Sequence, residues 1–208
     1  DMAEKGGYPD FMLKEIHEQP RVVRDTLVGR MTPAGELDID ELGLSLEELN
    51  DIDRVYVIAC GTSYHAGLIA KNLIEGWARI PTEVEAASEF RYRNPIITPT
   101  TLVVAVSQSG ETADTLAAIR DARIKGAKVF GITNVVGSPV ARESDGVIYT
   151  KANKEIAVAS TKSFIGQVVS LTLLALLLAA DLNVLCLGEQ SAASLGLHIG
   201  AVRFLGIL

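Results

Sequence analysis

The stretch that decides the fold is TLVVAVSQSGETADTL, residues 101–116. It begins as a run of apolar and β-branched residues, continues through serines, a glutamine and a glycine, and then takes on a helical pattern. A strand that is apolar on both faces is typical of a parallel sheet covered by helices on both sides. The stretch therefore predicts a strand, a polar turn and a helix of an α/β domain.

The same texture repeats along the chain. Short β-rich runs cover residues 54–60, 82–87, 101–107, 127–134 and 146–150, and helical patterns cover 64–78, 88–92, 111–125, 138–143 and 160–180. Strands that alternate with helices build a parallel sheet. We therefore predict a doubly wound, flavodoxin-like α/β domain, with five parallel strands in the order 2-1-3-4-5 and helices on both faces.

Three regions follow from this pattern. Residues 1–53 are predicted to form an N-terminal arm, in which two short helices are separated at Pro20 and followed by an acidic, solvated connector with a short helix over 45–50. Residues 54–186 are predicted to form the sheet domain, and residues 187–208 form a tail without assignment. A length of 208 residues is consistent with one domain and its extensions.

Composition argues against several classes of function. A net charge of −7 argues against a nucleic-acid surface, which needs a basic stripe. Two cysteines are too few for a disulfide scaffold, the three histidines are scattered, and no metal or other cofactor is expected. Because the N-terminal residues include no apolar signal segment, we expect a cytoplasmic location. Residues 168–187 approach the length of a membrane span but contain Asp181 and Asn183, so we predict a buried helix there.

The segment after the third strand is the first candidate for a ligand site. Ligands of doubly wound sheets bind outside the carboxyl ends of the strands, where the winding reverses. Here Ser107, Ser109 and Thr112 supply three hydroxyls, and Gly110 would let the backbone approach a ligand. The N–H groups at a helix start attract anions. Two interpretations stay open: a phosphate site, or ordinary helix capping, for which one hydroxyl is enough.

The segment after the first strand is expected at the same crevice. It contributes Thr62 and Ser63, which favours the phosphate interpretation. Cys60 ends the strand, and we expect a small buried residue there rather than a nucleophile. Arg91 and Arg93 are either ligands for an anion or, more commonly for such residues, members of surface ion pairs.

A third polar cluster, EIAVASTK at 155–162, lies directly before the long apolar helix. Ser160 or Thr161 is expected to cap this helix. A cation in the first turn is unfavourable beside the helix dipole. Lys162 is therefore expected either to have an anionic partner or to lie in solvent.

Four motifs in this order resemble the sugar isomerase (SIS) domain: GTSYHAG at 61–67, EVEAASEFRYR at 83–93, SQSGETADTL at 107–116 and EIAVASTKSF at 155–164. More closely, they resemble the first of two SIS domains in the isomerizing aminotransferases that make glucosamine 6-phosphate from fructose 6-phosphate and glutamine. The resemblance runs from about residue 8 to residue 178. Because only one set of motifs is present, the chain resembles a fragment of such an enzyme.

The resemblance implies a site for fructose 6-phosphate or glucose 6-phosphate, and a homodimer, which the apolar helix after residue 160 also suggests. In the family, the acid, base and lysine groups of catalysis come from the second SIS domain and the C-terminal tail, so the catalytic residues of this chain stay unknown. Glu155 is the nearby carboxylate considered as a possible base. The alternative is a stand-alone SIS module that senses a sugar phosphate without catalysis. The implied binding residues are Thr62, Ser63, Ser107, Gln108, Ser109 and Thr112 at the phosphate, with Val158 and Ser160 at the sugar.

Overall fold

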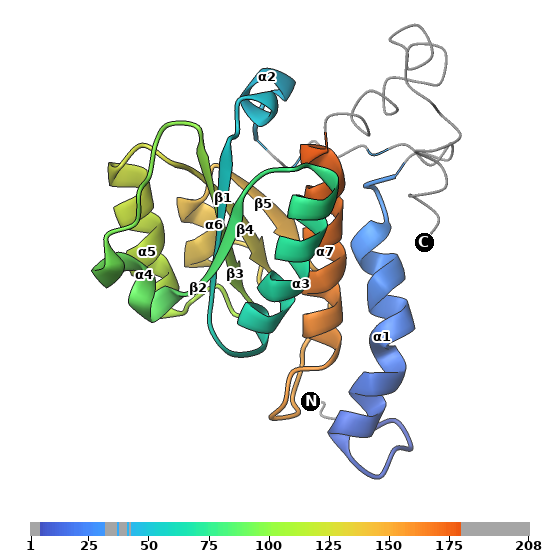
Figure 1. Cartoon of the computed structure of the whole chain (residues 1–208). Helices are drawn as coiled ribbons and strands as arrows, with labels where there is room; N and C mark the ends of the chain where they lie inside the picture. Colours follow the sequence, from blue (N-terminus) through green and yellow to red (C-terminus); the bar gives the residue numbers. More distant parts are fainter. Residues whose placement is uncertain (1–4, 32–36, 38–40, 42, 180–208) are drawn as a thin grey trace, which may run out of the picture.

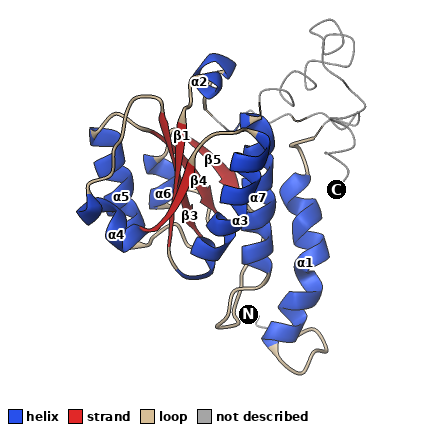
Figure 2. Cartoon of the chain, in the orientation of Figure 1, coloured by secondary structure: helices blue, strands red, loops and turns tan. Residues whose placement is uncertain are grey.

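A five-stranded parallel sheet forms the centre of the computed structural model (Figures 1 and 2), which describes residues 5–31, 37, 41 and 43–179. The predicted fold class and strand order are confirmed, because the strands follow one another as β2-β1-β3-β4-β5. The strands are β1 (Arg54–Ala59), β2 (Thr82–Ala86), β3 (Thr101–Ser107), β4 (Lys128–Thr133) and β5 (Gly146–Tyr149).

Helices cover both faces of the sheet (Figure 1). One face packs against α3 (Gly61–Trp77) and α7 (Lys162–Leu178), and the other against α4 (Ala87–Arg93), α5 (Ala113–Ile124) and α6 (Pro139–Glu143). Neighbouring residues of one strand enter different cores: Val57 packs on the side of α3 and α7, and Ile58 on the side of α4 and α5. Both faces are therefore dry, which explains the uninterrupted apolar runs.

The N-terminal arm contains one long helix, α1 (Phe11–Leu27), where the sequence predicted two short ones. Pro20 lies inside this helix. Proline removes the hydrogen bond to the carbonyl four residues earlier, which belongs to Ile16. Since Pro20 and Ile16 both lie on the exposed side of α1, water can take the place of the lost donor and the helix continues.

The arm packs directly against the sheet domain. In Figure 1, α1 lies along α7, and Val22 of α1 is buried beside Gly166 of α7. The Thr26 hydroxyl donates to the Thr150 carbonyl at 2.6 Å, and the guanidinium of the buried Arg30 donates to the Tyr149 carbonyl at 3.0 Å. The arm and the sheet domain therefore share a core.

The acidic connector also contributes to the core. The predicted short helix is α2 (Leu46–Asn50), and Ser45 and Glu48 form its capping box. Leu49 and Ile52 are buried, and Glu48 pairs with Lys128 of β4 at 2.5 Å. The connector is therefore less solvated than its charge suggested.

The apolar helix α7 is enclosed by the sheet, α3 and α1, as the expectation of a buried helix requires (Figure 1). Among the helices that the structure describes, none combines the length and the apolar character needed to cross a membrane. Since the chain itself covers this helix, its apolar surface no longer argues for self-association, and the homodimer stays a prediction. The unassigned tail, 187–208, lies outside the described residues.

Candidate functional site

A pocket of about 340 Å³ opens where β1 and β3 end. These two strands are neighbours, with Ala59 paired to Val106, so the segments that follow them meet at one edge of the sheet. Three segments line the pocket, and we call them its first, second and third walls: residues 60–63, residues 106–109 with 112, and residues 155, 157, 158 and 160. All eight residues named from the sequence as ligand contacts are among these lining residues. Their binding of a ligand stays a prediction.

The first wall is the beginning of α3. The helix starts at Gly61, three residues earlier than predicted, so Thr62 and Ser63 belong to its first turn and not to a loop. Cys60 is the N-cap and makes no side-chain capping bond. It is only half-buried and lines the pocket, so the expectation of a buried cysteine was wrong. The N–H groups at this helix start therefore have no side-chain cap.

Hydroxyls organise the second wall. The Ser107 Oγ accepts the Gly110 N–H at 3.0 Å and lies 3.0 Å from the Thr112 Oγ1. Thr112 precedes α5, which begins at Ala113, two residues later than predicted, and its side chain makes no capping bond. The first turn of α5 thus lacks the hydroxyl cap that was the competing explanation for this motif.

Packing inside the protein requires a glycine at position 110. Gly110 is not among the residues that line the pocket, and its approach to a ligand stays a prediction. Its φ of +66° lies in the left-handed region, and the residue is buried. A Cβ at this position would lie 2.5 Å from the Ser138 Cβ and 2.8 Å from the Thr133 Oγ1, and closer still to the Ser138 Oγ. The glycine therefore fits the second wall against β4 and the start of α6.

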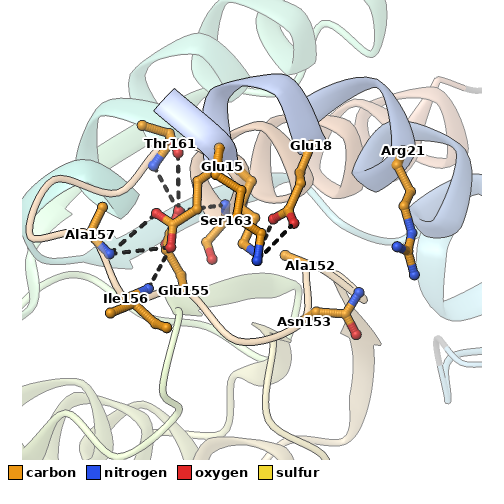
Figure 3. A network of polar contacts seen from close by, with 12 residues as sticks. Glu15, Glu18, Arg21, Ala152, Asn153, Glu155, Ile156, Ala157, Thr161 and Ser163 are labelled. Atoms are coloured by element: carbon orange, nitrogen blue, oxygen red, sulfur yellow. Dashed lines mark hydrogen bonds and ion pairs between the residues drawn. The ribbon is translucent and has the colours of Figure 1, made fainter. Parts of the chain in front are cut away.

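The third wall is held by Glu155 (Figure 3). Its carboxylate accepts the Thr161 N–H at 2.8 Å, the Ser160 hydroxyl at 2.9 Å and the Ser163 N–H at 3.3 Å. Thr161 is the N-cap of α7, one of the two residues predicted there, but its side chain makes no capping bond. The Glu155 carboxylate accepts the N–H groups at this helix start instead. Burial alone raises the pKa of Glu155, but hydrogen bonds led by that from the Thr161 N–H outweigh it and hold the pKa below the usual value of a glutamate.

This depressed pKa predicts a pH-dependent effect of Glu155→Gln on stability. A carboxyl group whose pKa is lower in the folded than in the unfolded protein stabilises the fold at pH values above its unfolded pKa, about 4.3 for glutamate. This stabilisation is lost as the pH falls through the folded pKa. We expect Glu155→Gln to lower the free energy of unfolding at pH 7 by about 1 to 2 kcal/mol, because an amide oxygen accepts these hydrogen bonds less strongly than a charged oxygen. The difference should shrink as the pH falls through the lowered pKa of Glu155. Urea unfolding across this range measures it. Glu111→Gln is the control, because it alters an exposed carboxylate just before α5. An equal loss of stability in this variant would contradict the capping role of Glu155.

The remaining predicted residues are distributed as follows. Val158 lies at the rim with its side chain fully exposed. Lys162 is buried and pairs with Glu18 at 2.6 Å, so it has the anionic partner that was one of its two interpretations. Arg93 forms ion pairs with Glu83 and Glu85, outside the pocket. The surface ion pair was therefore the right interpretation of Arg93.

Among the described residues, no group of three or more histidine, cysteine, aspartate or glutamate side chains could hold a metal ion. The pocket wall holds hydroxyls, an amide, one thiol and one carboxylate. Sequence reasoning missed Gly61, Val106 and Ala157 as lining residues. Each is adjacent to a predicted residue, so extending each motif by one position would have found them.

Comparison with known proteins identifies relatives of the chain. The SIS domain model matches residues 48–177. The chain is 55% identical over 181 residues to the glutamine–fructose-6-phosphate aminotransferase (isomerizing) of Clostridium tetani, which covers 87% of this chain and 30% of that protein. It is 57% identical over 197 residues to the enzyme of the same name from Symbiobacterium thermophilum, covering 94% of this chain and 32% of that one.

A solved structure gives the same result. The C-terminal domain of glucosamine-fructose-6-phosphate aminotransferase from Francisella tularensis superposes with a TM-score of 0.81 at 42% identity, covering 92% of this chain and 53% of that one. The chain thus spans about a third of the length of these curated relatives. The resemblance identified from the four motifs is confirmed.

Proposed function

The chain belongs to the SIS domain family, and we propose that it supplies the hexose 6-phosphate site of a glutamine–fructose-6-phosphate aminotransferase. In this proposal it binds fructose 6-phosphate or glucose 6-phosphate, and the complete enzyme forms glucosamine 6-phosphate. The observation that carries the proposal is the convergence of two helix starts, those of α3 and α5, on one hydroxyl-lined pocket.

Helix starts of this kind suit a phosphate group. The N–H groups of the first turn have no partner inside the helix, and the helix dipole adds a partial positive charge. Neither helix start is capped by a side chain, and Ser109 and Thr112 add hydroxyl donors beside α5. An anion can therefore be held without a lysine or arginine, in a protein whose net charge is −7.

The third wall suits the sugar. A pocket of about 340 Å³ is at the lower end of the range for small ligands, which matches a single phosphorylated hexose. Ser160 and the backbone near Ala157 and Val158 offer neutral polar groups, which pair with sugar hydroxyls. The phosphate is therefore assigned to the walls at α3 and α5, and the ring to the wall at 155–160.

The alternative is an SIS module that senses a sugar phosphate without catalysis. Relatives at 55 to 57% identity carry the name of an aminotransferase, which favours the enzyme. Both functions require the same phosphate site, so binding tests their common part. The homodimer and the cytoplasmic location stay predictions.

We predict that Ser109→Ala and Thr112→Ala each weaken the binding of glucose 6-phosphate by about one to two orders of magnitude, the loss of one hydrogen bond to a charged oxygen. Isothermal titration of the unaltered chain with glucose 6-phosphate, fructose 6-phosphate and glucose establishes the need for the phosphate. Thr172→Ala serves as the control, because this hydroxyl donates to the Val168 carbonyl within α7. Unchanged affinity in both pocket variants, with an intact fold, would leave these hydroxyls with a structural role alone.

A further inference from the structure

A buried carboxylate on the N-terminal arm holds the third wall of the pocket. Glu15 of α1 is only 2% exposed, and its carboxylate accepts the Ile156 N–H at 2.6 Å and the Ala157 N–H at 3.2 Å (Figure 3). Glu15 lies 141 positions before Ile156 and outside the matched residues 48–177. The part of the chain recognised as the SIS domain therefore does not contain every group that shapes the pocket.

A second contact ties the same helix to the end of this wall. Glu18, one turn after Glu15, pairs with the Nζ of Lys162 at 2.6 Å, and Lys162 is the first residue of α7. The Lys162 side chain is 5% exposed. Between these two contacts, α1 fixes both the start of the wall and the helix that follows it.

These contacts also decide what the third wall can bind. Glu15 accepts the N–H groups of residues 156 and 157, and Glu155 accepts those of residues 161 and 163. These donors are therefore not free for a phosphate. The carboxylate of Glu155, which lines this wall, and that of Glu15, which contacts its backbone, both disfavour an anion here. The other two walls present uncapped helix starts, which attract one. A sugar phosphate is thus oriented with its ring toward residues 155–160.

We propose that Glu15 is a positioning residue of the pocket, which holds residues 156 and 157 where the sugar ring is bound. The proposal rests on the proposed function, because it assigns a task in the binding of the same sugar phosphate. Glu15 itself lines no part of the pocket wall. It acts through the backbone of residues 156 and 157, in the wall assigned to the sugar ring. We therefore expect it to affect the binding of the ring and not that of the phosphate.

Glu15→Gln tests this proposal. The amide keeps the size of the side chain but replaces one of the two acceptor oxygens with a donor, which faces a backbone N–H. We expect the affinity for glucose 6-phosphate to fall about tenfold, while the affinity for inorganic phosphate, measured by NMR titration, stays the same. Asp25→Asn is the matched control, because Asp25 lies on α1 and pairs only with Arg21 on the surface among the contacts described. It should change neither affinity.

Hydrogen exchange of the Ile156 and Ala157 amides gives a readout that needs no ligand. We expect faster exchange at these two amides in Glu15→Gln, with the amides of β1 and β3 unchanged. If Glu15→Gln does not fold, Glu15→Asp, which keeps the charge on a shorter side chain, carries the same measurements. Unchanged affinity for glucose 6-phosphate, or an equal loss for glucose 6-phosphate and phosphate, overturns the proposal. If the unaltered chain binds no sugar phosphate, the proposed function fails, and unchanged amide exchange then also overturns the role of Glu15.

Discussion

Gly110→Ala is expected to lower the free energy of unfolding by about 2 to 5 kcal/mol and to abolish measurable binding of glucose 6-phosphate. Two costs add at this position. A non-glycine residue at a φ of +66° is strained by about 1 to 2 kcal/mol. Forcing a methyl group against Ser138 and Thr133 adds a further cost of about 1 to 3 kcal/mol. Any relief moves the second wall, because Gly110 also donates to the Ser107 Oγ.

Gly137→Ala separates the two costs. Gly137 has a similar φ, +69°, but a Cβ there would meet nothing within 4 Å. We expect the free energy of unfolding of this variant to fall only by the strain, about 1 to 2 kcal/mol, and its affinity for the sugar phosphate to stay the same. Urea unfolding and isothermal titration of both variants make the comparison. Equal destabilisation by the two alanines would show that crowding at Gly110 is unimportant.

The parallel sheet and the meeting of the first two polar segments could be predicted from the sequence pattern. The third segment, 155–162, was assigned to the same site only through the family resemblance. Apolar runs such as Leu102–Val106 are buried on both faces, which is typical of a parallel sheet between helices. Once the order 2-1-3-4-5 is assumed, the ends of the first and third strands must be neighbours, and the polar residues after them must share an edge. Local patterns therefore determined where the pocket would lie.

The helix starts and the continuity of α1 were predicted less well. A serine or threonine before a helix suggests a hydroxyl cap, yet Thr112 pairs with Ser107, and a carboxylate, Glu155, caps α7. Pro20 suggests a break, but the carbonyl that it leaves without a partner lies on the exposed side of α1. Both outcomes depend on which side of a helix faces solvent, which a local pattern does not state.

Glu15 was the most difficult contact to foresee. On a helical wheel, Glu15 is one of several charged residues of an amphipathic helix, and such residues are mostly exposed. It is buried because α1 packs along α7 and brings it to the amides of residues 156 and 157. A pairing across so many positions follows from the tertiary packing alone.

The second large effect concerns catalysis: this chain alone is expected to bind glucose 6-phosphate or fructose 6-phosphate without interconverting them. Isomerisation needs a base to move a proton between C1 and C2 of the sugar, within hydrogen-bond reach of the carbon. Among the residues that line the described pocket, only Cys60 and Glu155 carry a thiol or a carboxylate that could take up a proton from carbon. The Glu155 carboxylate already accepts hydrogen bonds from three residues, and its lowered pKa makes it a weaker base.

Proton exchange in deuterated water tests this division between binding and catalysis. A positioned base typically accelerates proton transfer by about 10² to 10⁴. Without such a base, we expect no deuterium at C1 or C2 above the protein-free background. NMR follows the incorporation under conditions in which titration shows that the sugar phosphate is bound. Glu155→Gln and Cys60→Ala are measured beside the unaltered chain. Deuterium incorporation that Glu155→Gln removes, while the sugar phosphate still binds, would show that Glu155 acts as the base despite its hydrogen bonds. The same outcome with Cys60→Ala would assign the base to the thiol at the start of α3.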